Sequence, residues 1–261
     1  MEDDLTERPA IDPSTSASLA GRHGLMTGAS ARLDALVDLL ATDPRAPTSV
    51  RGATDALDVH VADSLCGLLV AEVRTAGNLC DLGSGAGFPG LPLALALPHA
   101  TMRLLDSSRR KCEFLGRAVT AMGVGNVEVV CARAEGWPQG SGRHDAVLAR
   151  AVAPASVLIE YAAPLLRTGG VLVAWKGRRD SGAEDAGARV ASVLGLEPGP
   201  VLRTEPFVGA RDHHLHVYTK IHDTPTGFPR RPGMARKRPL AGRAPSALGL
   251  GRTTPSDRAE R

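Results

Sequence analysis

Short apolar runs alternate with longer amphipathic stretches between residues 78 and 220. Runs of four to six apolar residues are typical of buried strands, and the spacing between them is that of helices. Strands that alternate with helices predict a mostly parallel sheet joined by right-handed crossovers. We therefore expect an α/β fold with strands at Asn78–Leu82, Thr101–Leu105, Val127–Cys131, Asp145–Ala149, Val171–Trp175 and Leu215–Lys220, and a partner of the last strand near Gly199–Pro206.

The chain before the sheet has the periodicity of helices. One predicted face holds Leu33, Leu36, Val37 and Leu40, and a second holds Leu57, Val61, Leu65 and Leu68. We expect residues 25–76 to form an N-terminal helical extension and residues 77–222 to form the sheet domain. Residues 1–24 are polar and lack periodicity, so we expect them to be disordered.

The net charge of +3 conceals an uneven distribution. Residues 230–261 hold nine Arg or Lys against two acids, whereas the rest of the chain holds 22 basic and 26 acidic residues. Residues 223–261 are rich in Pro and Gly, so we expect a basic tail that attracts polyanions. A tail that only improves solubility is the simplest alternative.

Cysteine usage and hydropathy argue against several classes of protein. The four cysteines, Cys66, Cys80, Cys112 and Cys131, show no metal-binding spacing, so we expect free thiols, a reducing cytoplasm and no metal. No apolar run of membrane-spanning length and no secretion signal is evident, so we expect no membrane partner.

The segment after the first predicted strand carries the candidate chemistry. It reads Asp81-Leu-Gly-Ser-Gly-Ala-Gly-Phe-Pro-Gly90. Glycines let a backbone turn sharply and approach a ligand closely. Asp106 ends the next apolar run, where a carboxylate can accept both hydroxyls of a ribose. The two features together indicate a cofactor that contains adenosine.

Two cofactor classes fit the glycines. Gly85-x-Gly87-x-x-Gly90 also satisfies the dinucleotide pattern, and a purely structural turn is a third reading. Asp81 favours S-adenosylmethionine, because a carboxylate at the strand end repels a pyrophosphate and attracts a sulfonium or an amino group.

Other polar residues follow the later strands. Glu135 lies where an adenine would bind, although a turn cap is an equal alternative. Arg150 closes the fourth strand, and an unpaired arginine there would need an anion such as a ligand carboxylate or a phosphate. His60 and Asp63 share a helical face, where a structural hydrogen bond is the more ordinary role.

The segment after the fourth strand reads Ala149-Arg-Ala-Val-Ala-Pro154. It limits the kinds of acceptor atom that the reaction can use. It is not the Asn/Asp-Pro-Pro-aromatic segment that orients an exocyclic amine, and no Pro-Cys nucleophile is present. The acceptor should therefore need no activation. Guanine N7 meets this condition, while carboxylate, thiol and hydroxyl acceptors stay open.

Several motifs occur together in the order of a known family. From about Pro47 to Leu240 the chain resembles the bacterial 16S rRNA guanine-N7 methyltransferases, RsmG or GidB. The matching segments are Thr48-Ser-Val-Arg51, His60-x-x-Asp63-Ser64, the glycine loop extended to Pro92, Leu105-Asp-Ser107 with Lys111 and Phe114-Leu115, Arg133-Ala-Glu135, Ala149-Arg-Ala-Val-Ala153, Lys176-Gly177, and Phe228-Pro-Arg-Arg-Pro-Gly-Met234 with Lys237 to Leu240.

The resemblance implies a Rossmann-like class I S-adenosylmethionine-dependent methyltransferase that acts on N7 of guanine 527, in the 530 loop of 16S rRNA. It implies cofactor contacts at Gly83, Phe88, Ala134, Glu135 and Arg150, to which general features of the fold add Gly85 and Asp106. Candidate RNA contacts are Arg51, Lys176, Arg230, Arg231, Lys237 and Arg238. We expect no general base, with Arg150 and His60 as positioning residues.

We expect 16S rRNA or the small ribosomal subunit as the partner, not DNA, and a monomeric enzyme. A noncatalytic RNA-binding assembly factor and a small-molecule methyltransferase are the alternatives. The chain departs from the family at Ala46-Pro47, and at His213-His214-Leu215, where an expected anion contact could move to Arg211. Beyond Leu240 we find no counterpart in the family.

Overall fold

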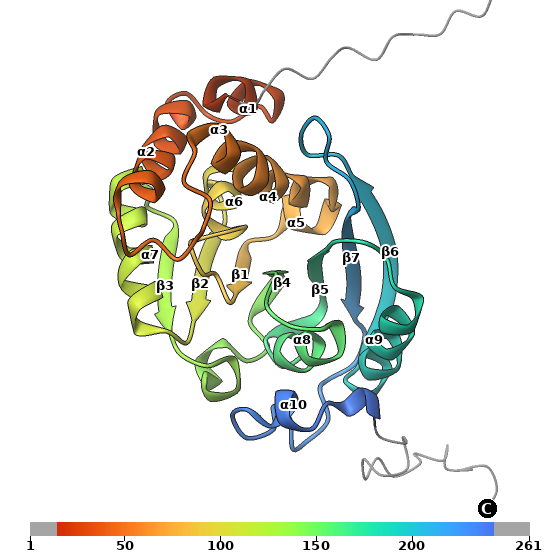
Figure 1. Ribbon diagram of the computed structural model, residues 1–261. Coiled ribbons are helices and arrows are strands. Elements are labelled where there is room, and N and C mark those ends of the chain that lie inside the picture. Colours follow the sequence, from red (N-terminus) through yellow and green to blue (C-terminus); the bar gives the residue numbers. More distant parts are fainter. Residues whose placement is uncertain (1–14, 243–261) are drawn as a thin grey trace, which may run out of the picture.

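Seven strands form one sheet in the computed structural model, which describes residues 15–242 (Figure 1). The strand order is β3-β2-β1-β4-β5-β7-β6. The first five of these strands are parallel, and β7 runs antiparallel to both β5 and β6. The strands are β1 (Asn78–Leu82), β2 (Thr101–Asp106), β3 (Val127–Cys131), β4 (His144–Arg150), β5 (Leu166–Lys176), β6 (Leu196–Thr204) and β7 (His213–Lys220).

This sheet confirms the mostly parallel α/β fold that the apolar runs predict. All seven expected strands are present, including the edge hairpin formed by β6 and β7. The largest difference is in β5, which begins at Leu166 instead of Val171. The added residues include Gly169 and Gly170, which the apolar pattern could not mark as strand.

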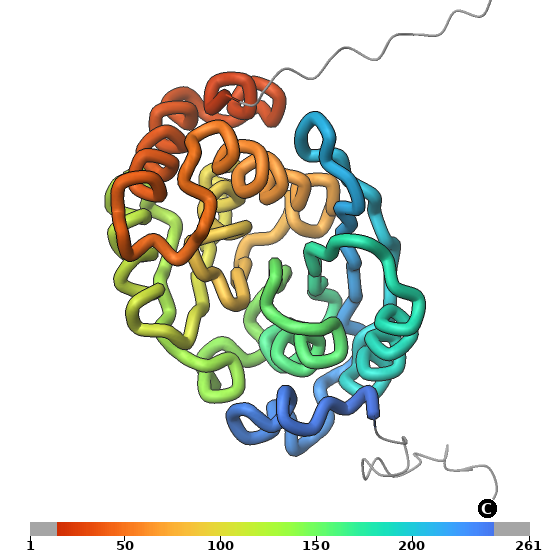
Figure 2. Tube along the Cα trace, in the orientation of Figure 1, coloured from red at the N-terminus to blue at the C-terminus, as the bar shows by residue number. Residues whose placement is uncertain are grey.

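Helices cover both faces of the sheet (Figures 1 and 2). Neighbouring residues of β1 show the alternation: Leu79 belongs to one buried cluster and Cys80 to the other. The first layer contains α2 (Ala29–Thr42), α3 (Ala53–Ala56), α4 (Asp63–Leu65), α5 (Ala71–Thr75), α6 (Gly90–Ala96) and α7 (Arg109–Met122). The second contains α8 (Ala155–Ala162), α9 (Ser181–Val193) and α10 (Met234–Lys237).

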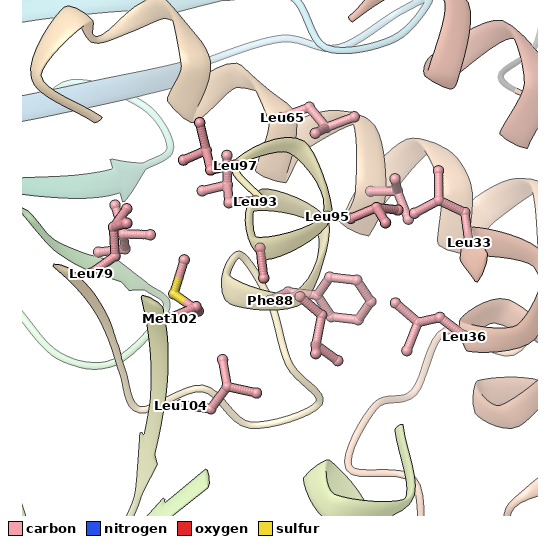
Figure 3. Packing of buried hydrophobic residues seen from close by; sticks show 14 of the residues in the cluster. Leu33, Leu36, Leu65, Leu79, Phe88, Leu93, Leu95, Leu97, Met102 and Leu104 are labelled. Carbon is pink, nitrogen blue, oxygen red and sulfur yellow. The ribbon is translucent and has the colours of Figure 1, made fainter. Parts of the chain in front are cut away.

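The N-terminal helical extension packs directly on the glycine-loop helix. Leu33 and Leu36 of α2 are completely buried, and Figure 3 shows them near Phe88 and Leu95 of the loop and α6. Between α3 and α4 the chain forms a π-helical stretch, Leu57–Ala62, and after α4 a 3-10 turn, Cys66–Leu69. A π-helical turn changes the direction of the side chains that follow it, and such turns are common at functional sites.

Helix α1 (Ser16–Arg22) corrects the expectation of disorder in this part of residues 1–24, while residues 1–14 lie outside the described chain. The hydroxyl of Thr15 accepts a hydrogen bond from the Ser18 N–H, and the Ser18 hydroxyl accepts one from the Thr15 N–H. This capping box starts the helix, and the completely buried Leu19 fixes it to the core. Packing against α2, which composition does not reveal, supplies the stability of this short helix.

The segment 223–242 is not a separate tail. Ala235 and Leu240 are buried in the same cluster as α8 and α9, and Figure 1 shows α10 beneath α8. Two 3-10 turns, Ala134–Gly136 and Pro138–Gly140, lie between β3 and β4, and a third, Leu240–Gly242, ends the described chain. The expected basic tail of residues 223–261 therefore packs on the core up to residue 242, and its remainder lies outside the described residues.

We predict that Leu19→Ala lowers the free energy of unfolding by about 2–4 kcal/mol, because it removes a completely buried side chain. Met26→Ala is the matched control, since Met26 is 65% exposed and should cost less than about 0.5 kcal/mol. Urea unfolding of both variants measures the difference. Equal stability of the two variants would show that α1 is not docked.

Candidate active site

The glycine loop joins β1 to α6 with three residues in left-handed backbone conformations. Gly83, Gly85 and Gly87 have φ values of 73°, 59° and 97°. Gly90 is required for a different reason, because a Cβ there would lie 2.3 Å from the Leu104 side chain and 2.7 Å from Oδ2 of Asp81. The glycines thus give the loop its sharp turn and bring α6 against the end of β1.

Asp81 lies under this loop with no exposed surface. Its Oδ2 accepts a hydrogen bond from the Gly90 N–H at 3.0 Å, and its Oδ1 has no hydrogen-bond partner among the described residues. Burial raises the pKa of this carboxyl to about 7. A buried carboxylate with one unsatisfied oxygen fits a ligand that brings a positive charge to this loop, as S-adenosylmethionine does.

Asp106, at the end of β2, is also buried and is held by the neighbouring backbone. The Ser108 N–H donates to its Oδ1 at 2.9 Å, and the Gly85 N–H donates to its Oδ2 at 3.1 Å. The Lys111 ammonium lies 3.5 Å from Oδ2. Each carboxylate oxygen can accept more than one hydrogen bond, so the group is oriented and still able to accept ribose hydroxyls.

A cavity of about 290 Å³ opens beside Asp106. Four predicted cofactor residues contribute to its wall: Gly83, Asp106, Ala134 and Glu135. Gly85 and Phe88 do not line this cavity; the Gly85 N–H donates to Asp106, and Phe88 is buried. The remaining lining residues are Leu82, Leu105, Ser107, Lys111, Ala132, Arg133, Ala151, Val152, Tyr161 and Arg236.

Arg150, at the end of β4, corrects the expectation of an unpaired arginine. Its Nη1 donates to Asp63 Oδ2 at 3.0 Å and to the Val59 carbonyl at 2.9 Å. Its Nη2 donates to His60 Nδ1 at 3.0 Å. The anion that Arg150 requires is therefore Asp63, which the helical extension of the same chain supplies.

His60 is neutral and its tautomer follows from its partners. An arginine can only donate, so Nδ1 must be the accepting nitrogen, and Nε2 carries the proton and donates to the Thr48 hydroxyl at 2.9 Å. Burial and the adjacent Arg150 lower the pKa of His60 to about 4. The ring also stacks on Phe88, with centroids 4.6 Å apart. His60 thus has no free lone pair with which to remove a proton.

Comparison with known proteins places the chain in a family. A family model described as rRNA small subunit methyltransferase G matches residues 35–203. The chain belongs to this family. A relative named ribosomal RNA small subunit methyltransferase G from Rubrobacter xylanophilus is 42% identical over 189 residues, which cover 70% of this chain and 72% of the relative. One of the same name from Deinococcus radiodurans is 39% identical over 199 residues, 74% of this chain and 78% of the relative.

The fold is shared more widely than the family. A structure described as an SAM-dependent methyltransferase from Aquifex aeolicus aligns with a TM-score of 0.50 at 16% identity, covering 73% of this chain and 98% of that one. The likeness agrees with the Rossmann-like class I fold expected from the sequence.

Several basic residues predicted to contact RNA in this methyltransferase G family member have partners within the protein. The Arg51 guanidinium donates to the carbonyls of Leu40, Asp43 and Ala46, and Lys176 Nζ donates to the Ala153 carbonyl at 2.9 Å.

Arg230 forms a double hydrogen bond with the buried carboxylate of Glu160, at 2.6 and 2.5 Å. This pair anchors the C-terminal segment to α8, and contact of Arg230 with RNA stays a prediction. The other three predicted contacts, Arg231, Lys237 and Arg238, are exposed.

The C-terminal segment supplies site residues that sequence reasoning missed. Arg236 lines the cofactor cavity and donates to the Val152 carbonyl at 3.1 Å. The Gly233 N–H donates to Glu135 Oε1 at 3.0 Å, which orients that carboxylate. Tyr161 of α8 completes this wall. About 100 residues separate Glu135 from Gly233, so only the matching motif around Met234 pointed to this segment.

Cys66 and Cys112 are buried within the described chain. Burial raises the pKa of Cys66 and of Cys112 to about 12, so both remain thiols. Within residues 15–242 no group of three His, Cys, Asp or Glu side chains is arranged to hold a metal ion. No helix in that range is long and apolar enough to cross a membrane.

We predict that affinity for S-adenosylmethionine increases as the pH rises through about 7. Burial raises the pKa of Asp81 to about 7, so its carboxyl gains a proton below that pH, and a bound cation favours the ionised form. Affinity should therefore fall by up to about tenfold per pH unit below 7. Calorimetric titration between pH 5.5 and 7.5 measures this dependence.

Asp81→Asn should bind the cofactor more weakly and remove most of the pH dependence. Asp145→Asn is the matched control, because Asp145 lies at the amino end of β4, away from the cavity. An unchanged pH dependence in Asp81→Asn would contradict the role of this carboxylate.

Proposed function

We propose that the protein transfers a methyl group from S-adenosylmethionine to N7 of a guanine in 16S rRNA. Membership of the methyltransferase G family supports the reaction class and the RNA. The observation that carries the proposal is the pairing of a cofactor cleft with a neutral His60 whose two ring nitrogens are both engaged. Neither ring nitrogen of His60 is therefore free to remove a proton from a nucleophile.

Guanine N7 is suited to such a site. When bound, S-adenosylmethionine supplies a methyl group on a positively charged sulfur, which the free lone pair of guanine N7 can take without loss of a proton. The residues of the chain then contribute mainly by alignment and by charge. Asp106 would accept the ribose hydroxyls, and Asp81 would balance the positive charge near the glycine loop.

Phe88 and Arg150 have an indirect part in this proposal. The Phe88 ring stacks on His60, and the Arg150 guanidinium lies 5.4 Å from its centroid. The glycine loop is thereby coupled to the Arg150 network, and we propose that this coupling fixes the end of β4 beside the methyl group. Direct cofactor contacts from Phe88 and Arg150 remain a prediction of the family resemblance.

Neither alternative function is favoured. A noncatalytic RNA-binding assembly factor would not need the oriented Asp106 or the unsatisfied oxygen of Asp81. A small-molecule methyltransferase does not agree with membership of an rRNA methyltransferase family. We propose further that the enzyme acts as a monomer in the cytoplasm, on RNA and not on DNA.

Methyl transfer to RNA can be tested with small-subunit rRNA taken from cells that lack the enzyme. The protein and radiolabelled S-adenosylmethionine should label this RNA, and mass spectrometry of a nucleoside digest should show 7-methylguanosine. Absence of label would contradict the proposed function, and label on another atom would contradict the assignment to N7.

We predict that Arg150→Ala lowers the rate of methyl transfer about 100-fold, because it frees the end of β4 and His60 from their fixed arrangement. It should also destabilise the protein by about 3–5 kcal/mol, since Asp63 loses its buried partner. Rates are therefore compared at a temperature where the variant is folded. Arg167→Ala, which breaks an ion pair at the opposite edge of the sheet, is the control. Normal methylation by folded Arg150→Ala protein would refute the role of Arg150.

We predict different results from two C-terminal truncations. Ending the chain at residue 242 removes four Arg and two acids, so the salt dependence of RNA affinity should weaken by about one or two phosphate contacts while cofactor affinity is unchanged. Ending it at residue 229 also removes Gly233 and Arg236, and cofactor affinity should fall at least tenfold. Equal cofactor affinity in both truncations would contradict a role for this segment in the cofactor site.

A further inference from the structure

A second cavity, of about 630 Å³, lies at the carboxyl ends of β4 and β5. This volume falls within the range of roughly 300–1,000 Å³ that is usual for small-molecule sites. Its wall combines the helical extension, the strand ends and the segment before β7. The lining residues are Asp63, Arg150, Ala151, Trp175, Lys176, Gly177, Arg178, Arg211, Asp212 and His213.

This second cavity adjoins the cofactor cavity at a single residue. Ala151 is the one residue that lines both cavities. It directly follows β4, so the backbone between Arg150 and Val152 separates the two spaces. A group bound in the second cavity at Ala151 would therefore lie next to the part of the cofactor that is bound at Ala151.

Backbone strain is concentrated in the wall of the second cavity. Ala151 and Asp212, with φ values of 54° and 55°, are the two non-glycine residues between residues 15 and 242 that have a positive φ. Both line this cavity. Such conformations cost of order 1–3 kcal/mol each and cluster at functional sites. Their coincidence indicates that the wall is shaped for a ligand.

The charge of the wall favours an anionic ligand. Four basic side chains, from Arg150, Lys176, Arg178 and Arg211, face two acidic ones, from Asp63 and Asp212. Asp63 is already engaged by Arg150 and by His213, whose Nδ1 lies 3.1 Å from Asp63 Oδ1. The pair between Arg178 and Asp212 is 3.7 Å long and exposed, so it leaves Arg178 available to a ligand.

We propose that the second cavity receives the guanine nucleotide of the RNA that is methylated, with its base against Ala151 and its phosphates against Lys176, Arg178 and Arg211. This assignment rests on the proposed function. A guanine reaches such a cavity only when it is unstacked, as in a single-stranded loop. The buried Asp63 binds both Arg150 and His213, which line the cavity, and acts as a positioning residue.

The basic rim is tested by Arg178→Ala combined with Arg211→Ala. Binding of a hairpin RNA with the sequence of the proposed target loop should weaken about 10- to 100-fold, and the salt dependence should fall by one or two phosphate contacts. Affinity for S-adenosylmethionine should not change, because neither residue lines the cofactor cavity. Arg143→Ala is the matched control, since Arg143 is exposed and precedes the opposite end of β4.

The cavity itself is tested by Gly177→Trp. A Cβ at Gly177 meets only the Asp212 carbonyl, at 3.6 Å, so the backbone tolerates a side chain while the added ring takes up cavity volume. In wild-type protein, a 4-thiouridine placed beside the target guanine should crosslink to the residues of the second cavity under ultraviolet light. In Gly177→Trp this crosslink should be lost, while the melting temperature and the affinity for the cofactor are retained. Gly116→Trp, on the exposed face of α7, is the control for adding a ring.

The outcomes separate this assignment from the proposed function. If wild-type protein methylates the RNA, and the rim and Gly177 variants bind and crosslink as wild type does, the acceptor nucleotide lies elsewhere and the assignment is wrong. If wild-type protein transfers no methyl group but its RNA binding depends on the rim and on Gly177, the catalytic proposal fails and the nucleotide site stands. Absence of RNA binding by wild-type protein would overturn the nucleotide site.

Discussion

The buried ion pair between Asp63 and Arg150 holds the candidate active site together. The two side chains are only 6% and 17% exposed, so their charges have lost most of their water. Such a pair is stable only if further hydrogen bonds satisfy it, and here the Val59 carbonyl, His60 and His213 do so. The helical extension, the end of β4 and the start of β7 are thereby fixed to one another.

Two cavities meet at Ala151, the residue that follows Arg150. One is built on the glycine loop and Asp106, the other on the strand ends and the segment before β7. The Phe88 ring joins the glycine loop to the Arg150 network, because it contacts both His60 and Arg150. The C-terminal segment closes the other side of the cofactor cavity through Arg236 and the hydrogen bond to Glu135.

Sequence reasoning succeeded where the signal is local. The strands follow from short apolar runs, and the loop before α6 follows from glycines whose positive φ no other residue adopts easily. It failed where partners are distant. Local reasoning could not pair Arg150, because Asp63 lies 87 residues away, or pair Arg230, because Glu160 lies 70 residues away. Helix α1 was missed because burial of Leu19, and not helix propensity, stabilises it.

The sequence by itself therefore determined the sheet, the cofactor loop and the family, since each depends on the order and type of neighbouring residues. Only the tertiary structure decided which charges are already neutralised within the protein, which tautomer His60 adopts and where a second cavity opens. These properties arise from desolvation and from hydrogen bonds between segments far apart in the chain, and both depend on distances that no local pattern records.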